Sequence, residues 1–287
     1  MRFIKKKKWR VSQMFRRYKA FMKTGILNIF AYKFNIFSWL LVVASSLLCL
    51  FFLWAAVFKN SPVDIINGFT FKEIISYTII VNIFGFTMGG GETTDVITDE
   101  IQNGQIAMSL IKPISYRLRF VFSTLGGLLA SDLIVGFPLL IVSTILLTFN
   151  GFMTIESPAN FIIMLIFFLV AQVIAKMLFD VIDYIFGLIS FYTMASFGLN
   201  QIKEVVTNFL SGMLIPIAFF PEWMANIINY LPFVGMAQNP ALIYLGKMSV
   251  NEALISIGMQ ILWLIILETF AHFFYLKAIK IVTIQGG

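Results

Sequence analysis

The sequence has little of what a soluble enzyme uses. It contains one cysteine, Cys49, and one histidine, His272, which excludes a disulfide framework, a cysteine zinc site and a paired-histidine metal site within this chain. Only 12% of the residues are charged, about half of the ~25% found in an ordinary soluble domain. No GxxxxGK[ST] phosphate loop, HExxH motif or usable Ser-His-Asp set occurs. We therefore expect no catalysis, no metal and no bound cofactor in this chain.

Apolar residues are what the sequence has in abundance. They make up 59% of the chain, and the mean hydropathy is +0.90. A soluble fold could not cover so much apolar surface, whereas lipid tolerates it. Each membrane span needs about 20 such residues, so we predict an all-α integral membrane protein with six transmembrane helices. The predicted spans are residues 36–58, 74–91, 120–149, 159–195, 205–219 and 253–276.

The apolar stretch 159–195 is too long for one simple crossing. Two crossings there would give seven spans, and one long tilted or bent helix gives six. With six spans and a cytoplasmic N-terminus, 17 of the 21 Lys and Arg fall in cytoplasmic segments and three in outer ones. Because cytoplasmic loops carry an excess of basic residues, we predict six spans with both termini in the cytoplasm.

Residues 1–34 form a basic segment. Eleven of the 21 Lys and Arg lie in its first 33 residues, which contain no acid. From Val11 to Ile29 the apolar residues recur at helical spacing, which predicts an amphipathic helix in the membrane surface, beside anionic lipid headgroups. A nucleic-acid arm or a calmodulin-like target is less favoured, because a membrane span follows at once. The basic part is too long for a cleavable signal peptide.

A polar segment, residues 92–119, separates the second and third spans. Thr94 is a candidate N-cap for a first short helix, and Gly104 stands where a helix C-terminus favours glycine. A second short helix, "QIAMSLI", ends before Pro113. The apolar set Ile101, Ile106 and Leu110 suits docking into a groove on another protein. A re-entry loop that packs on its own spans fits the spacing equally well.

Three prolines, Pro216, Pro221 and Pro232, interrupt the apolar stretch 210–233. Proline removes a backbone donor and kinks or ends a helix. We therefore expect Pro216 to kink the fifth span near its outer end and Pro221 to stop it. A short helix over "PEWMANIINYLPF" then places Trp223 in the headgroup region, and Pro232 turns the chain towards the sixth span.

Two of these segments resemble the ABC-2 type permeases, the membrane subunits of type-2 ABC exporters. The first carries their cytoplasmic-loop pattern at Asp99, Glu100, Ile101, Gly104, Ile106, Leu110, Pro113 and Ser115. The second carries their other hallmark at Ser211, Gly212, Pro216, Phe220, Pro221, Leu231, Pro232 and Phe233. The entry to the first span, "YKFNIFSWL", is similar to that of the short permeases that lack a fused ATPase domain.

The resemblance implies an assembly and a mechanism. Two permease subunits, both this chain or this chain and a relative, would pair in a bacterial plasma membrane above two separate ATPase subunits that hold ATP and magnesium. The segment at about 94–113 would carry the coupling helix that fits into the ATPase. The 220–252 segment would re-enter the outer leaflet and form a gate, although a loop lying on the outer surface remains the alternative. Expected cargo is amphipathic: a peptide, lipid, glycolipid or drug. Nucleic acid is not an expected partner.

Ionisable residues inside spans usually face a bundle interior or water. The candidates are Asp132, Lys176, Asp180, Asp183, Glu268 and His272. Lys176 with Asp180, and Glu268 with His272, are four residues apart and therefore share a helix face, which favours structural pairing over a substrate lining. Asp132, ~20 Å into its span at 1.5 Å per residue, has no partner in its own helix and is the better functional candidate.

Two rival hypotheses belong to other classes. One is a secondary transporter that needs no ATPase and is driven by protons through Asp132, Asp180 and Glu268. The other is a membrane scaffold or immunity protein without transport activity. Transport by the chain alone under a pH gradient, or vanadate-sensitive transport by a complex, would separate the three.

Overall fold

The computed structural model describes residues 18–28, 30, 33–87, 92–155, 157–193 and 196–285. Most of the predicted basic segment and the glycine run at 88–91 lie outside these residues. Apart from one small hairpin, the described chain is helical. After a helix at residues 18–28, the elements are α2 (Lys33–Lys59), β1 (Ile65–Ile66), β2 (Phe69–Thr70), α3 (Phe71–Thr87), α4 (Glu92–Gln102), α5 (Ile106–Leu110), α6 (Tyr116–Ser131), the π-helical turn η1 (Asp132–Gly136), α7 (Phe137–Phe149), α8 (Pro158–Ile189), α9 (Ser196–Leu210), the 3-10 turn η2 (Ile217–Phe219), α10 (Glu222–Ile228), the 3-10 turn η3 (Val234–Met236), α11 (Gln238–Tyr244) and α12 (Val250–Gln285).

Four helical stretches are long and apolar enough to cross a membrane in the described part of the chain. They are Leu40–Lys59, Tyr116–Phe149, Pro158–Ile189 and Val250–Ile281. The third of these is one uninterrupted helix, as the six-span interpretation requires. The chain is therefore an all-helical protein with several membrane helices. Of the shorter helices, α3 is apolar, whereas α9 is amphipathic and contains Lys203 and Glu204.

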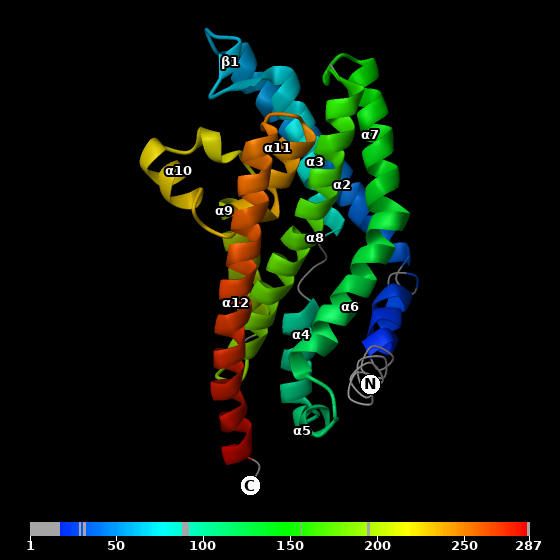
Figure 1. The fold of residues 1–287 in the computed structure, drawn as a ribbon, viewed down its shortest axis with the longest axis vertical. Helices are drawn as coiled ribbons and strands as arrows, with labels where there is room; N and C mark the ends of the chain where they lie inside the picture. The colour runs from blue at the N-terminus through cyan, green and yellow to red at the C-terminus, as the bar shows by residue number, and fades with distance from the viewer. Residues whose placement is uncertain are drawn as a thin grey trace, which may run out of the picture.

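The two ends of the molecule differ (Figure 1). The helix at residues 18–28, the pair α4 and α5, and the end of α12 lie towards one end. The β1–β2 hairpin and the turn after α7 lie at the opposite end. That turn contains Gly151 at φ +66°, which agrees with the Asn150-Gly151 turn signal in the sequence.

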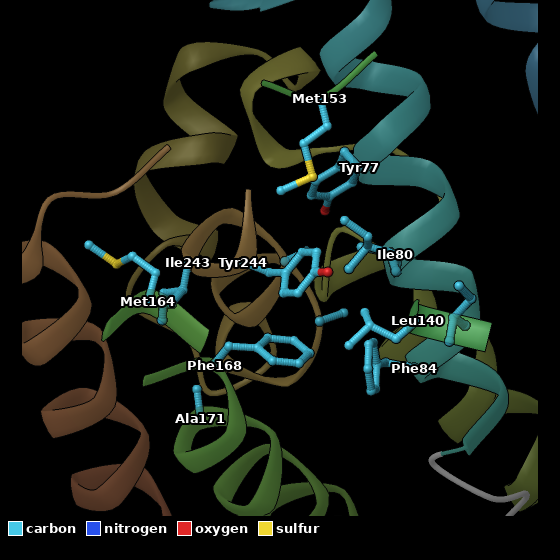
Figure 2. Packing of buried hydrophobic residues seen from close by; sticks show 14 of the residues in the cluster. Tyr77, Ile80, Phe84, Leu140, Met153, Met164, Phe168, Ala171, Ile243 and Tyr244 are labelled. Carbon is cyan, nitrogen blue, oxygen red and sulfur yellow. The ribbon is translucent and has the colours of Figure 1, made fainter. Parts of the chain in front are cut away.

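Helix α3 forms the centre of the largest apolar cluster. Tyr77, Ile80 and Phe84 of this helix are buried and point towards Phe168 of α8 and Tyr244 of α11 (Figure 2). The ring centroids of Phe84 and Phe168 lie 4.9 Å apart, as do those of Phe168 and Tyr244. Helix α3 therefore packs against other helices of the same chain on several sides.

The helix at residues 18–28 packs on α6 through glycines. A Cβ atom on Gly25 would lie 2.1 Å from the carbonyl oxygen of Ser123, and one on Gly126 would lie 2.0 Å from that of Met22. Only glycine permits such a close approach of two helix backbones. Tyr18 adds a tether at the other end of the contact, because its hydroxyl accepts a hydrogen bond of 2.8 Å from the backbone N–H of Ser115.

Gly126→Ala is expected to loosen this helix from α6. Overpacking of this kind costs about 1–3 kcal/mol, so trypsin should cleave at the exposed Lys19 and Lys23 about tenfold faster, as mass spectrometry of the fragments would record. Gly127→Ala is the matched control, since its nearest backbone contact would be an ordinary 3.8 Å. Equal cleavage of the two variants would contradict a glycine-dependent contact.

The predicted fifth span, 205–219, is not one continuous helix. Helix α9 begins nine residues earlier, at Ser196, and ends at Leu210. The signal that was missed is Gly212, which follows the helix at φ +79° and stands where a Cβ would lie 2.9 Å from the Tyr77 hydroxyl. Because the helix has already ended, Pro216 does not kink it.

The stretch after α9 is built from short turns rather than from one helix. Pro221 does not end α9, which stops at Leu210, but directly precedes α10. Ser211 is buried, and its carbonyl accepts the N–H of Gln238, whose side-chain oxygen in turn accepts the N–H of Ile217. Buried side chains of Ile217, Ile228 and Val234 form a separate small core under α10. The segment is thus ordered by its own contacts.

Candidate functional site

Three charged residues follow one face of α8. Lys176, Asp180 and Asp183 are spaced at i, i+4 and i+7, and all three are at least 97% buried. The predicted pairing of Lys176 with Asp180 inside the helix is wrong, because each of the three side chains pairs with a residue from elsewhere in the fold. Buried charges are stable only when they are paired and hydrogen bonded, and α8 obtains its partners from four other elements.

Lys176 pairs with Asp132, which has no partner in its own helix, as the sequence predicted. Its Nζ lies 2.7 Å from Asp132 Oδ1. Asp132 opens the π-helical turn between α6 and α7, a rare geometry that is frequent at functional sites. The pair joins α8 to this turn, and it gives the buried Asp132 carboxylate a counter-charge.

Arg117 of α6 sits between two acids. Its Nη2 lies 2.7 Å from Asp180 Oδ2 and 2.6 Å from Glu268 Oε1 of α12. The guanidinium carbon also lies 4.7 Å from the centre of the Tyr184 ring. The expected pairing of Glu268 with His272 is wrong, since Glu268 is bound by Arg117 and His272 is exposed. Arg117 therefore holds α6, α8 and α12 together.

Asp183 joins α8 to the start of α4 and to α9. Its Oδ2 accepts the backbone N–H of Thr93 at 3.0 Å, and its Oδ1 accepts the Thr94 hydroxyl at 2.6 Å. Lys203 of α9 forms an ion pair with the same Oδ1. The predicted N-cap role of Thr94 is wrong, because α4 already begins at Glu92. The carboxylate of Asp183, which belongs to α8, accepts the backbone N–H of Thr93 near the start of α4 instead.

Glu100 fastens α4 to α5 and α6. Its carboxylate accepts hydrogen bonds from the Arg119 guanidinium at 2.7 and 3.0 Å, from Ser109 at 2.8 Å and from Tyr116 at 2.9 Å. Burial opposes ionisation, yet these donors hold the pKa of Glu100 below its ordinary value. Glu100 therefore connects α4 to α5 and α6, and its charge is not free to bind a partner.

The apolar residues of the 92–119 segment divide into two sets. Ile101, Ile106 and Leu110 pack in a cluster with residues of α6, α8 and α12, which is the alternative of a loop packed on its own spans. Met108 and Ile111 point outwards, with 63% and 74% of their surface exposed. An exposed surface suited to a partner thus exists at the tip of α5.

The remaining predicted positions of this segment lie at its surface. Asp99, Gly104 and Pro113 are exposed. Gly104 follows α4 with φ +68°, which confirms the predicted glycine at the end of the first short helix. Exposed Asp99 therefore precedes the turn at Gly104, and the exposed apolar side chains Met108 and Ile111 lie between this turn and Pro113.

The predicted gate residues do not form one cluster with the charged residues. Pro216 and Pro232 are buried in the 211–236 stretch, whereas Pro221 is exposed. Trp223 and Tyr230 expose 66% and 72% of their surface, an arrangement typical of aromatic side chains at a membrane interface. The expected short helix is present as α10.

A family model described as an ABC-2 family transporter protein matches residues 44–286. The chain belongs to the ABC-2 transporter family. No curated protein and no solved structure matches it. The transporter is thus a multi-pass membrane protein. Within it, the 92–119 segment is fastened to the long helices by buried charges.

Sequence reasoning missed the cations of these clusters. Arg117, Arg119 and Lys203 had entered the prediction only as counts of cytoplasmic charge. Each lies within a few residues of a predicted span boundary. This position could have indicated that these cations pair with the acids inside the spans. The described residues of the transporter contain no group of three or more His, Cys, Asp or Glu that could hold a metal.

Proposed function

We propose that this chain is the membrane-spanning permease subunit of an ATP-driven exporter. It pairs with a second permease subunit and with two separate ATPase subunits, which hold ATP and magnesium. The cargo is an amphipathic peptide, lipid, glycolipid or drug. The proposal depends on the arrangement of α4 and α5. Met108 and Ile111 at the tip of α5 are exposed, and we call them the docking tip. Hydrogen-bonded charged residues connect α4 and α5 to α6, α8 and α9.

The topology of this proposal has six crossings in a bacterial plasma membrane. Helix α3 has 17 residues, or ~26 Å at 1.5 Å per residue, which is close to the ~30 Å of a hydrocarbon core. Helix α9 and residues 211–219 share the fifth crossing. Both termini and the α4–α5 pair are cytoplasmic in this topology; the helix at residues 18–28, the end of α12 and the α4–α5 pair lie towards one end of the molecule (Figure 1).

Movement passes from the ATPase to the spans through the charged residues of α8. When two ATPase subunits close on ATP, they displace Met108 and Ile111 at the tip of α5. Glu100 carries that displacement to α6, and Asp183 carries it to α8 and α9. Discrete repacking of such helices switches the central path from inward-facing to outward-facing. The 211–233 stretch then opens as the outer gate.

The secondary-transporter hypothesis has less support. Asp132, Asp180 and Glu268 each lie within 2.7 Å of a Lys or Arg nitrogen, so none is a lone acid poised to exchange protons. The chain reconstituted alone under a pH gradient should not transport. Vanadate-sensitive transport by the complex purified from its native membrane would exclude a scaffold role.

Ile111→Asp combined with Met108→Asp is expected to weaken ATPase binding at least tenfold. The two carboxylates would have to be desolvated where apolar surface was buried. Co-purified ATPase per permease and ATP hydrolysis by the complex are the measurements. Ile65→Asp is the matched control, because Ile65 is 61% exposed and lies at the opposite end (Figure 1). Full ATPase recovery with the double variant would refute the proposed docking tip.

A further inference from the structure

The polar face of α9 is wider than the surface that other helices cover. Lys203 and Thr207 are buried, and Lys203 forms an ion pair with a carboxylate of α8. Next to them on the circumference of the helix lie Gln201, Glu204 and Asn208, which share one face because they are spaced at i, i+3 and i+7. Gln201 and Glu204 are exposed, and Asn208 is half-buried. We call these three residues the polar strip.

An apolar strip completes the exposed side of α9. Ile202, Val205 and Phe209 share a second face with the same spacing, and all three are exposed. In the proposed topology α9 belongs to the fifth crossing, so this apolar strip suits contact with lipid. The polar strip lies between the apolar strip and the buried polar face, and lipid cannot solvate it.

Glu204 differs from the other acids of the membrane helices. Asp132, Asp180, Asp183 and Glu268 each form an ion pair with a Lys or Arg side chain. Within the described part of the chain, the Glu204 carboxylate has neither an ion pair nor a hydrogen bond. It is therefore an exposed charge without a counter-charge in these residues.

In the proposed topology, Glu204 lies inside the fifth crossing. It follows the start of α9 by eight residues and precedes the end by six, which is ~12 Å and ~9 Å at 1.5 Å per residue. Ionisable residues at such a depth are costly unless they face a bundle interior or a water-filled cavity. Because the Glu204 side chain is exposed, a water-filled path is the surrounding that solvates it.

The polar strip favours a positive charge. Its charged member is an acid, and the neighbouring Lys203 is already neutralised by Asp183. Carboxylates that line a membrane path attract cations and repel anions. The side-chain oxygens of Gln201 and Asn208 also accept hydrogen bonds from ammonium or guanidinium groups. The strip therefore matches a cationic group, whereas a phosphate or carboxylate group would be repelled.

We propose that the polar strip lines the translocation path and that Glu204 selects cargo with a cationic group. The cargo is then an amphipathic cation, a peptide or drug that carries an ammonium or guanidinium group. This inference rests on the proposed transport function, because it names the class of cargo. The water and the charge of the strip can nevertheless be measured without any ATPase.

The first test compares neighbouring positions on the two exposed strips of α9. Gln201→Cys and Ile202→Cys, each combined with Cys49→Ser, place single thiols ~1.5 Å apart in depth. A water-soluble cationic thiosulfonate should modify Gln201→Cys at least tenfold faster than Ile202→Cys in membrane vesicles, because the reactive thiolate forms in water and not in lipid. Mass spectrometry of the full chain records both rates. Equal rates would overturn the proposal.

The second test measures the charge beside the strip. Cationic and anionic thiosulfonates of similar size react with Gln201→Cys, and each rate is divided by that of the same reagent with a free thiol in solution. The corrected cation-to-anion ratio should be about ten. It should fall three- to tenfold with Glu204→Gln and invert with Glu204→Lys, and both proteins should fold because the side chain is exposed and unbonded in the described chain.

Asp64→Asn is the matched control for the loss of one carboxylate. Asp64 is exposed and directly precedes β1, at the end of the molecule opposite α4 and α5 (Figure 1). The ratio should therefore stay unchanged in this variant. A ratio that Glu204→Gln also left unchanged would overturn the selection by Glu204. If that variant separated paired permeases instead, the strip would be a subunit interface and the proposal would be wrong.

The third test uses vesicles that contain the complex of the permease and its ATPase. The probes are a fluorescent dodecylamine and its neutral N-acetylated form. Vanadate-sensitive export of the amine should be at least tenfold faster, and Glu204→Gln should remove most of this preference. Equal export of the two probes would overturn the cargo class alone. Absence of vanadate-sensitive export for every cargo offered would instead refute the proposed function, while the two labelling results would still hold.

Discussion

Asp183→Asn is expected to lower the free energy of unfolding by about 3–5 kcal/mol, because it leaves the Lys203 ammonium buried without a counter-charge. Both side chains are only 4% exposed. The same substitution weakens the bonds to Thr93 and Thr94 that fix the start of α4. ATP hydrolysis by the complex should therefore continue while substrate export falls by at least tenfold.

The midpoint of thermal unfolding and amide hydrogen exchange across α4 measure the two structural effects. Asp95→Asn is the matched control, since Asp95 lies in the same turn of α4 but is exposed and bonded only to Asn200 among described partners. Surface changes of this kind usually stay within about 0.5 kcal/mol. If Asp183→Asn left both the exchange of α4 and export unaltered, the route through α8 would have to be abandoned.

Lys176→Met is expected to be nearly as damaging, and adding Asp132→Leu is expected to restore most of the loss. Removal of one partner strands a buried charge, at about 3–5 kcal/mol, whereas replacing both with apolar residues is often neutral or stabilising. In a membrane helix the stranded carboxylate has no water to solvate it. The single variant should be recovered in low yield and the double variant in normal yield.

Export by the double variant then decides what the pair does. Normal export would make it a packing device between α8 and the π-helical turn, whereas a folded but inactive double variant would assign it a role in the path. Lys247→Met controls for charge loss, because its pair with Glu73 is partly exposed and should contribute about 0–1 kcal/mol. A single Lys176→Met variant as stable as the parent chain would contradict the whole argument.

The sequence predicted the elements whose signals are local. Gly104 and Pro113 mark the ends of the two short helices. The positive φ of Gly104 and the missing N–H of Pro113 affect only the residues beside them, so such ends can be predicted locally. The continuity of α8 followed from weighing the basic residues on the two sides of the membrane. The same local reasoning failed at Gly212, where a helix stop within an apolar run was interpreted as part of a span.

The charge pairs were not predictable in this way. Spacing shows which residues share a helix face, and it therefore suggested Lys176 with Asp180. The actual partner of Lys176, Asp132, is 44 residues away, and that of Asp180, Arg117, is 63 residues away. Such pairs depend on which helices become neighbours, and no periodicity within one helix contains that information.

The length of α12 has a geometric consequence. Its 36 residues extend for ~54 Å at 1.5 Å per residue, whereas a hydrocarbon core is ~30 Å thick. Several turns of this helix must therefore extend beyond the hydrocarbon core, and its final turns lie at the end of the molecule that also carries α4 and α5 (Figure 1). The end of α12 therefore projects beside the tip of α5. A soluble subunit that reaches this tip would also contact α12, so it could not rest on a flat membrane surface.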